Sequence, residues 1–296
     1  MGRTTYLAAV MLAAVLAGCP KDERSITVGS KNFLEQVLLG EIAAQHLEHR
    51  LGDRIARKLN LGGTLLVHQA IINGDVDLYP EYTGTGAAIL NMAPSQDGQQ
   101  LLAEVRREYA ARFRLVWLEP LGFSNTFAMV IRKIDADRAQ VRTISDTERR
   151  PVTWVLGMGY EFQQRADGLP SLLRTYKLPI RGTPKVMDLG LLYRALEQGE
   201  VTMIAANSTD GPLASPSLVV LEDDRHCFPA YHAAFVVRQH TLSREPRLQA
   251  ALEELSGQFS EDVMRRLNAQ VLNRHGRVEE VAKQFLTDVG LRPRSN

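Results

Sequence analysis

The pattern of apolar and polar positions along the chain changes repeatedly between helical spacing and the short runs typical of strands. An apolar stripe that includes Leu34, Leu38 and Ile42 predicts a helix from about residue 33 to residue 51. Short apolar runs predict strands at residues 26–29, 76–79, 116–117, 126–131, 152–156, 201–205 and 233–238. Further helices are predicted at residues 67–73, 101–113 and 187–198, with a set of amphipathic helices from 247 to 289. Because strands and helices alternate, we expect an α/β fold with mostly parallel sheets.

One helix–turn–strand pattern occurs twice. Residues 70–77 (AIINGDVD) and 195–202 (ALEQGEVT) share the order helix, Gly, acidic residue, Val, and a short apolar strand and a polar loop follow each. Ligands of open α/β sheets bind beyond the carboxyl ends of the strands. Tyr82 and Thr85 after the first strand, and Asn207 to Asp210 after the second, are therefore candidates for two walls of one cleft. Chance recurrence of such units is the alternative.

The first residues have the pattern of a secretory signal. Arg3 precedes an apolar run at residues 6–17, which is too short for a permanent membrane helix of about 20 residues. The small residues just before Cys19 resemble the bacterial lipobox, and this resemblance implies cleavage before Cys19 and lipid on its sulfur. We expect a signal peptide at residues 1–18 and a polar tether at 19–25. An ordinary secretion signal with an incidental cysteine is the alternative.

The rest of the chain has no second long apolar run, so we expect it to contain no permease portion. Its length of roughly 278 residues exceeds the usual size of one domain and predicts two lobes. The 35 Lys and Arg residues balance the 34 Asp and Glu residues and are dispersed, which argues against nucleic acid as a partner. Cys227, the only other cysteine, is expected to be a small buried apolar residue.

The chain carries none of the short motifs that mark common enzyme classes. It has no G-x-S-x-G elbow, no P-loop and no H-E-x-x-H sequence, and no nucleophile–base set can be named. We therefore expect no catalysis, no cofactor and no metal. His46 and His49 have a spacing on the first predicted helix that could hold a metal, but Glu48 and Arg50 beside them favour a solvated face.

Aromatic residues lie at the ends of predicted strands, where ligands bind. Tyr82, Phe127 and Tyr231 are the candidates. The face of an aromatic ring attracts a quaternary ammonium, and each such contact contributes about 0.5–2 kcal/mol. Three contacts could support micromolar binding, about −8 kcal/mol, only with apolar burial and a polar anchor. Core packing is the alternative for each ring taken alone.

Several motifs, in order along almost the whole mature chain, resemble the glycine betaine/choline/carnitine substrate-binding proteins of ABC importers. They are GSKNFLEQ (29–36), LYPEYTGT (78–85), PLGFSNT (120–126), Glu161-Phe162 with Arg165, DGLP (167–170), MDLGL (187–191), STDG (208–211) and LEDD (221–224). The resemblance implies a type II periplasmic-binding-protein fold, in which two α/β lobes joined by a two-strand hinge close over a ligand. Lobe I would hold residues 26–126 and 228–296, and lobe II residues 127–227.

The resemblance also implies an aromatic cage for a trimethylammonium group. Four tyrosines typical of the family match Tyr82, Phe127, Asn207 and Tyr231 of this chain. Polar partners match Lys31 or Gln36 near the first helix, Thr85, and Arg165, which could pair with a ligand carboxylate; Asn125 and Asp210 complete the candidate set. Phe127 keeps the aromatic face and loses the hydroxyl. Asn207 replaces an aromatic wall with an amide.

The resemblance implies a lipid-anchored binding protein in the periplasm or at the cell surface. We expect a monomer that captures a quaternary-ammonium or betaine-type osmoprotectant and delivers it to an ABC permease with its ATPase. Because of Asn207, another zwitterion such as ergothioneine, or an amino acid, is an alternative ligand. A sensor subunit and a tethered enzyme acting on a choline-like compound are the alternatives of a different class.

Overall fold

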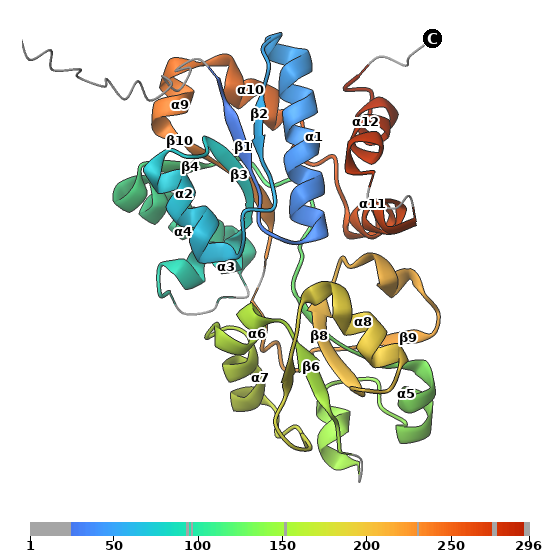
Figure 1. Cartoon of the computed structure of the whole chain (residues 1–296). Coiled ribbons are helices and arrows are strands. Elements are labelled where there is room, and N and C mark those ends of the chain that lie inside the picture. The colour runs from blue at the N-terminus through green and yellow to red at the C-terminus, as the bar shows by residue number, and fades with distance from the viewer. Residues whose placement is uncertain are drawn as a thin grey trace, which may run out of the picture.

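The described residues form two separate five-stranded sheets, which lie one above the other in Figure 1. The computed structural model describes residues 25–92, 95, 97–150, 153–229, 231–273 and 277–292. The first sheet has the order β2-β1-β3-β10-β4 and contains β1 (Thr27–Gly29), β2 (Ala56–Lys58), β3 (Leu78–Tyr82), β4 (Leu115–Trp117) and β10 (Ala233–Arg238). The second has the order β7-β6-β8-β5-β9 and contains β5 (Phe127–Arg132), β6 (Leu156–Met158), β7 (Lys185–Val186), β8 (Met203–Asn207) and β9 (Leu218–Leu221).

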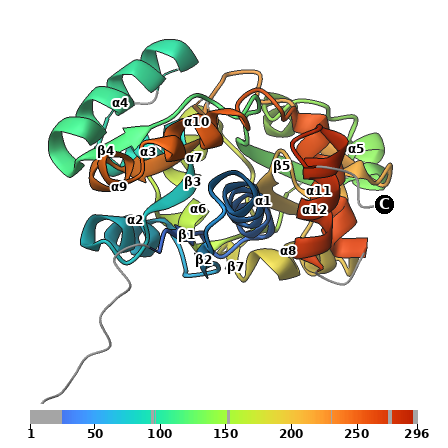
Figure 2. The same ribbon diagram turned by 90° about the horizontal axis from the view of Figure 1, so that it is seen from above.

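Helices cover both faces of the first sheet and complete lobe I. They are α1 (Leu34–Leu51), α2 (Thr64–Asn73), α3 (Thr83–Ile89), α4 (Gly98–Phe113), α9 (Gln239–Arg244), α10 (Arg247–Glu253), α11 (Glu261–Asn273) and α12 (Val278–Asp288). Alternate residues of β10 point to opposite faces of the sheet. Phe235 and Val237 pack on the side of α1, and Ala234 and Val236 pack on the side of α2 and α4. Figure 2 shows α11 and α12 beside α1, on the side away from α2 and α4.

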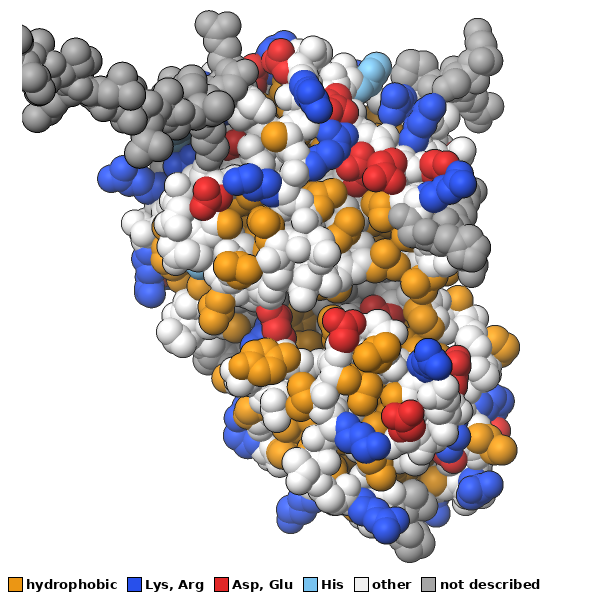
Figure 3. Space-filling model, in the orientation of Figure 1, with side chains coloured by type: hydrophobic (Ala, Val, Ile, Leu, Met, Phe, Trp, Pro, Cys, Tyr) orange, Lys and Arg blue, Asp and Glu red, His pale blue; other side chains and the backbone are white. Residues whose placement is uncertain are grey.

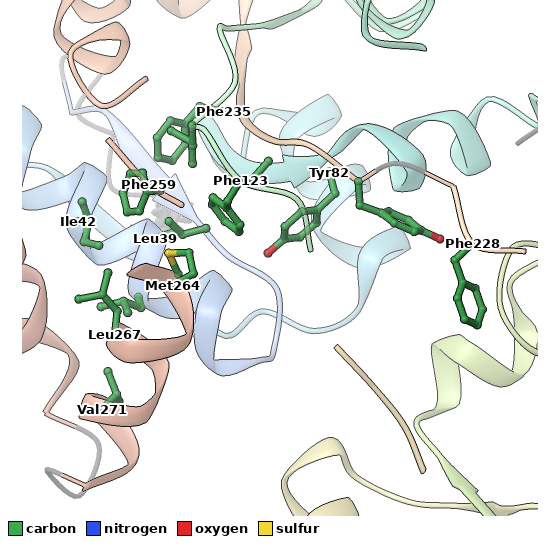
Figure 4. Packing of buried hydrophobic residues seen from close by; sticks show 14 of the residues in the cluster. Leu39, Ile42, Tyr82, Phe123, Phe228, Phe235, Phe259, Met264, Leu267 and Val271 are labelled. Carbon is green, nitrogen blue, oxygen red and sulfur yellow. The ribbon is translucent and has the colours of Figure 1, made fainter. Parts of the chain in front are cut away.

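The second sheet is covered in the same way and forms lobe II. Its helices are α5 (Lys133–Ala139), α6 (Tyr160–Gln164), α7 (Leu169–Thr175) and α8 (Leu189–Glu197), with 3-10 turns η1 (Ser145–Arg149) and η2 (Gly211–Ala214). Helix α8 packs on Val130 and Ile204. Figure 4 shows Tyr82 at the edge of the lobe I core and Phe228 apart from it, beside lobe II.

The expectation of mostly parallel sheets is confirmed for strand direction in the described residues, because four of the five strands of each sheet run the same way and β10 and β5 are the reversed ones. β1 pairs in parallel with β2 and β3, and β6 with β7 and β8, but β10 is antiparallel to β3 and β4, and β5 is antiparallel to β8 and β9. A parallel neighbour requires a crossover connection within its own sheet. β5 and β10 instead each follow a segment that arrives from the other lobe, so they can run in the opposite direction.

The chain crosses between the sheets twice, and the two crossing segments run side by side. The backbone N–H of Asn125 donates to the carbonyl oxygen of Tyr231 at 3.1 Å, and Tyr231 N–H donates to Ser124 Oγ at 3.2 Å. Ser124 also forms an antiparallel bridge with His232. This confirms two α/β lobes joined by two strands, whereas the residue boundaries given above for the lobes stay a prediction.

Two smaller expectations have different outcomes. His46 is fully buried, and its Nε2 lies 2.9 Å from Ala251 O and 3.2 Å from a Glu254 carboxylate oxygen, so the expected solvated position is wrong for His46. It is wrong because α10 covers this part of α1, whereas His49 is exposed. The signal peptide and Cys19 lie outside the described residues. Within the part of the chain that is described, no helix is long and apolar enough to cross a bilayer.

Candidate functional site

A cavity of about 880 Å³ lies between the two lobes, and its mouth appears as the hollow between the upper and lower halves of Figure 3. Residues from both lobes and from both crossing segments line it. Eight of the ten predicted ligand-binding residues are among them: Lys31, Tyr82, Thr85, Asn125, Phe127, Arg165, Asn207 and Tyr231. The structure therefore gathers in one place residues that are up to 200 positions apart in the sequence.

The other two predicted residues, Gln36 and Asp210, do not line the cavity. Gln36 is fully buried, and its Oε1 accepts a hydrogen bond from the backbone of Lys31 at 3.3 Å. Asp210 accepts hydrogen bonds from the backbone and the side chain of Asn207. Their polar atoms are directed into the protein and not into the cavity. Each of them instead bonds to a neighbour that lines the cavity, Gln36 to Lys31 and Asp210 to Asn207.

The strand ends explain why the walls come together. Tyr82 is the last residue of β3, Asn207 is the last residue of β8, and Phe127 is the first residue of β5. Because β5 and β8 are antiparallel, the start of one meets the end of the other, and Phe127 and Asn207 are direct partners in the ladder. Directly opposite residues project from the same face of a sheet with Cβ atoms about 5 Å apart.

The aromatic part of the cavity is larger than the sequence predicted. The Phe127 ring meets Tyr231 edge-on, with centroids 5.7 Å apart, and it meets Phe162 at 4.9 Å. Phe33 stacks on Tyr82 at 6.3 Å. Phe33 and Phe162 also line the cavity. They lie in the GSKNFLEQ and Glu161-Phe162 strings, which was the signal available for them in the sequence.

Two protein cations lie over these aromatic faces. The guanidinium carbon of Arg165 is 5.4 Å from the ring centroid of Phe127 and 5.7 Å from that of Tyr231. The ammonium of Lys31 is 5.1 Å from the ring centroid of Tyr82. All three distances are within the range of about 6 Å at which a cation is attracted to a ring face. The faces therefore lie where a ligand cation could be held.

Arg165 is also a bridge between the lobes. Its Nε and Nη2 donate to the two oxygens of Asp167 at 2.9 and 2.5 Å, and its Nη1 donates to Thr85 Oγ1 of lobe I at 3.0 Å. Asp167 also accepts a hydrogen bond from the Tyr231 hydroxyl at 2.6 Å. A bidentate pair of this kind fixes the plane of the guanidinium.

Lys31 is paired in a similar way on lobe I. Its Nζ donates to Glu81 at 2.5 Å, and both side chains are buried. Glu81 also accepts hydrogen bonds from Tyr79 OH at 3.2 Å and from the backbone of Tyr82 at 2.8 Å. Each cation at the cavity therefore has its own carboxylate.

A third carboxylate, Glu35, has no cationic partner among the described residues. It accepts four hydrogen bonds from neutral groups: Tyr82 OH at 2.6 Å, Asn125 Nδ2 at 2.9 Å, Thr209 Oγ1 at 2.5 Å and Asn268 Nδ2 at 3.0 Å. Burial raises the pKa of Glu35 above its ordinary value, although the four hydrogen bonds oppose the rise.

Asp210 is the corresponding carboxylate of lobe II. It accepts hydrogen bonds from Tyr193 OH at 3.0 Å and from Asn207 N and Nδ2 at 3.1 and 3.3 Å. Burial is also the cause that raises the pKa of Asp210. In the described part of the chain, the carboxylates around the cavity thus outnumber the cations Lys31 and Arg165, because Glu161 and Asp188 also line it. Their field favours a positive charge in the cavity.

Comparison with known proteins agrees with this geometry. A family model described as the substrate-binding domain of ABC-type glycine betaine transport systems matches residues 24–288. The glycine betaine-binding protein YehZ of Escherichia coli (strain K12) is 31% identical over 95% of each chain. A crystal structure described as a glycine betaine/carnitine/choline ABC transporter superposes with a TM-score of 0.75 and 28% identity, over 90% of this chain and 99% of that one.

A further relative is longer than this chain. The ergothioneine transport permease/ergothioneine binding protein EgtU of Helicobacter pylori (strain G27) is 33% identical over 95% of this chain, which spans about half (51%) of its length. The solved relatives and the two sheets identify the type II periplasmic-binding-protein fold. The chain belongs to the family of substrate-binding domains of ABC-type glycine betaine transport systems.

Proposed function

We propose that this protein is the extracytoplasmic binding protein of an ABC importer and captures a betaine-type solute between its lobes. The observation that carries this proposal is the position of Arg165 and Lys31 over the rings of Phe127, Tyr231 and Tyr82, at 5.1–5.7 Å. These faces belong to both lobes and to a crossing segment, so the cavity offers ring faces to a cation from each of these parts of its wall.

In this proposal the ligand exchanges places with Arg165. A ligand carboxylate draws the guanidinium away from Phe127 and Tyr231, and the ligand ammonium takes the ring faces it leaves. The carboxylates of Glu35 and Asp210 favour the incoming cation. Because such a ligand touches both lobes, it stabilises the arrangement in which they are close together, and an importer can recognise that arrangement.

The relatives divide on the identity of the ligand. The Escherichia coli relative is named for glycine betaine and the Helicobacter pylori relative for ergothioneine, and both are close to one third identical to this chain. A betaine with a trimethylammonium group is the ligand class that the ring faces support. Ergothioneine is the second candidate, because the cavity of about 880 Å³ has room beyond a small betaine and Asn207 adds a polar group to its wall. An amino acid is the remaining alternative, and of these three kinds of ligand it would make the least contact with the aromatic rings.

The proposal has further parts, which membership of the family and the residues before Cys19 support. The protein would act as a monomer, deliver its ligand to a permease with its ATPase, and need no cofactor or catalytic group. Lipid on Cys19 would hold it at the membrane, in the periplasm or at the cell surface. Attachment by lipid can be tested by mass spectrometry of the wild type and of Cys19→Ser expressed in a bacterial host.

The ligand proposal is tested by titration calorimetry and thermal unfolding with glycine betaine, choline, carnitine and ergothioneine. We expect at least one of them to bind with a Kd near the micromolar range, and about 2.7 kcal/mol of stabilisation at a concentration of 100 Kd. The matched control is 3,3-dimethylbutanol, which has the shape of choline with carbon in place of the charged nitrogen. Equal binding of choline and this neutral analogue, or binding of none of the four cations, would overturn the proposal.

A further inference from the structure

The amide of Asn207 presents one defined polar atom to the cavity. Its Nδ2 donates to Asp210 Oδ1 at 3.3 Å, while its backbone N–H donates to Asp210 Oδ2 at 3.1 Å. The hydroxyl of Tyr193 donates to the same carboxylate at 3.0 Å and fixes it. When Asp210 is ionised it only accepts hydrogen bonds, so in that form the amide nitrogen of Asn207 faces Asp210. The carbonyl oxygen, Oδ1, is left for the cavity that Asn207 lines.

This oxygen has no hydrogen-bond donor from the protein within the described residues. It lies beside the aromatic wall, because Asn207 and Phe127 are direct partners in the β5–β8 ladder and project from the same face of the sheet. A cation centred on the Phe127 ring is therefore within reach of Asn207 Oδ1. A methyl group placed against the oxygen offers only a weak C–H contact, whereas an N–H or O–H satisfies it.

Asn125, on a crossing segment, repeats the same arrangement. Its Nδ2 donates to Glu35 at 2.9 Å, and its Oδ1 is buried without a partner. The cavity wall thus contains two amides that are each tied through nitrogen to a carboxylate without a cationic partner, and each leaves its oxygen unpaired. A hydrogen-bond acceptor that lies close to a carboxylate favours a cationic group that can also donate a hydrogen bond.

We propose that Asn207, oriented by Asp210, accepts a hydrogen bond from the ligand. The cavity would then prefer a cationic ligand with an N–H or O–H on or beside its charged centre. This inference rests on the proposed function and narrows its ligand class. A fully methylated ammonium without a donor would cover the Asn207 oxygen and remove it from water without replacing the hydrogen bond.

Two pairs of probes that differ in one donor test this. N,N-dimethylglycine has an N–H where glycine betaine has a methyl group, and carnitine has a hydroxyl that 4-trimethylammoniobutanoate lacks. Titration calorimetry gives the affinity ratio within each pair for the wild type and for Asn207→Leu. We expect the ratio to favour the donor-bearing member about tenfold more in the wild type than in the variant, in at least one pair. The dimethylglycine pair reports a donor on the charged centre, and the carnitine pair reports a donor beside it.

Asn73→Leu is the matched control, because Asn73 is an exposed amide at the end of α2 that does not line the cavity, and its variant should keep the wild-type ratios. If Asn207→Leu does not fold, Asp210→Asn replaces it, since the Asn207 amide can then turn over and the preference should fall. Ratios that are the same in the wild type and the variant overturn the inference while the proposed function stands. Failure of all four probes to bind the wild type overturns the inference, and failure of choline and ergothioneine as well overturns the proposed function with it.

Discussion

Glu161 of lobe II binds Thr64 at the start of α2 in lobe I, across the mouth of the cavity. Glu161 Oε1 accepts the backbone N–H of Thr64 at 2.5 Å, and Oε2 accepts the Thr64 hydroxyl at 2.9 Å. The amino-terminal end of a helix carries a partial positive charge, which favours a carboxylate there. Gly63 makes the approach possible, because a Cβ at this position would be 2.6 Å from Glu161 Oε1.

Loss of the Glu161 carboxylate should therefore favour separated lobes. Because Glu161 is partly exposed, we expect Glu161→Ala to destabilise the close arrangement by about 1 kcal/mol, which is roughly a fivefold change in the equilibrium between close and separated lobes. Small-angle scattering of the ligand-free protein should show a larger radius of gyration. Glu197→Ala, which removes an exposed carboxylate from α8, is the control and should scatter like the wild type. Identical curves for all three proteins would show that this contact does not hold the lobes together.

Two substitutions distinguish the contribution of the Tyr231 ring to binding from that of its hydroxyl. Tyr231→Leu removes the face beneath Arg165, and we expect it to weaken binding of the tightest quaternary ammonium ligand about tenfold, as expected for the loss of one cation–ring contact. Tyr231→Phe keeps the face and loses only the 2.6 Å hydrogen bond to Asp167, so its effect should be smaller. Calorimetry measures both, with thermal unfolding to verify that each variant folds. Equal affinity in Tyr231→Leu and the wild type would remove Tyr231 from the binding site.

The raised pKa values of Glu35 and Asp210 predict that binding of a cation releases protons. Burial holds part of the population of each carboxyl in the protonated form above the ordinary values of 4.5 and 3.8. A cation in the cavity favours the ionised form and lowers both pKa values, so affinity should rise with pH through the raised pKa. Calorimetry in two buffers with different heats of ionisation counts the protons. Uptake of protons, or affinity that falls as pH rises, would contradict the inference that Glu35 and Asp210 favour a cation in the cavity.

How far the sequence determines the elements can be seen by comparing β10 with α3. The run at residues 233–238 is apolar on both faces, and β10 occupies those same residues. Helix α3 was not predicted, since TGTGAAI contains two glycines and two threonines, which favour helices poorly. Tertiary packing outweighs that propensity, because Gly86 lies so close to the Trp117 ring that a Cβ there would be 2.6 Å from Cζ2. Strand β6 begins only at Leu156, because its pairing with β8 and not its apolar run sets its register.

The site likewise has features that the local sequence predicts and features that only tertiary packing decides. Positions at strand ends predicted that Tyr82 and Asn207 would line two walls of one cleft, and both line the cavity between the two sheets. The role of Glu35 could not be predicted in this way. A glutamate in the first turn of an amphipathic helix usually faces solvent, and only the packing of lobe II and α11 encloses this one. The placement of Arg165 over two rings likewise depends on contacts between lobes that no local pattern encodes.

Stability should fall as the solution is acidified through pH 6.5, because of His68. This residue lies between the rings of Tyr109, at 5.5 Å, and Phe113, at 4.8 Å, and neither ring nitrogen has a partner in the described residues. Burial lowers the pKa of His68, so below pH 6.5 the unfolded chain binds a proton that the folded protein does not. Each such histidine reduces the free energy of unfolding by at most about 1.4 kcal/mol per pH unit.

Urea unfolding of His68→Phe at pH 7.5 and pH 5.5 checks this. The variant should lose less stability on acidification than the wild type, because the buried site can no longer titrate. The exposed His49 supplies the control, and His49→Phe should retain the wild-type difference between the two pH values. His46, whose pKa burial also lowers, should keep part of the dependence in His68→Phe. The same loss of stability in His68→Phe and the wild type would exclude His68 as a source.

Gly211 provides the last prediction, because it lies where lobe II touches α11 of lobe I. A Cβ on Gly211 would lie 2.7 Å from the backbone nitrogen of Ala269, and helix backbone cannot move aside as a flexible side chain does. Gly211→Ala should therefore displace η2 from α11 and weaken the hydrogen bond from Arg265 Nε to Ser208 O. We expect a loss of about 1–3 kcal/mol in the free energy of unfolding, as for other overpacked contacts. Gly190→Ala is the control, since its Cβ would meet only the Asp188 side chain at 3.2 Å, and equal stability of both variants would show that the lobes do not need this close approach.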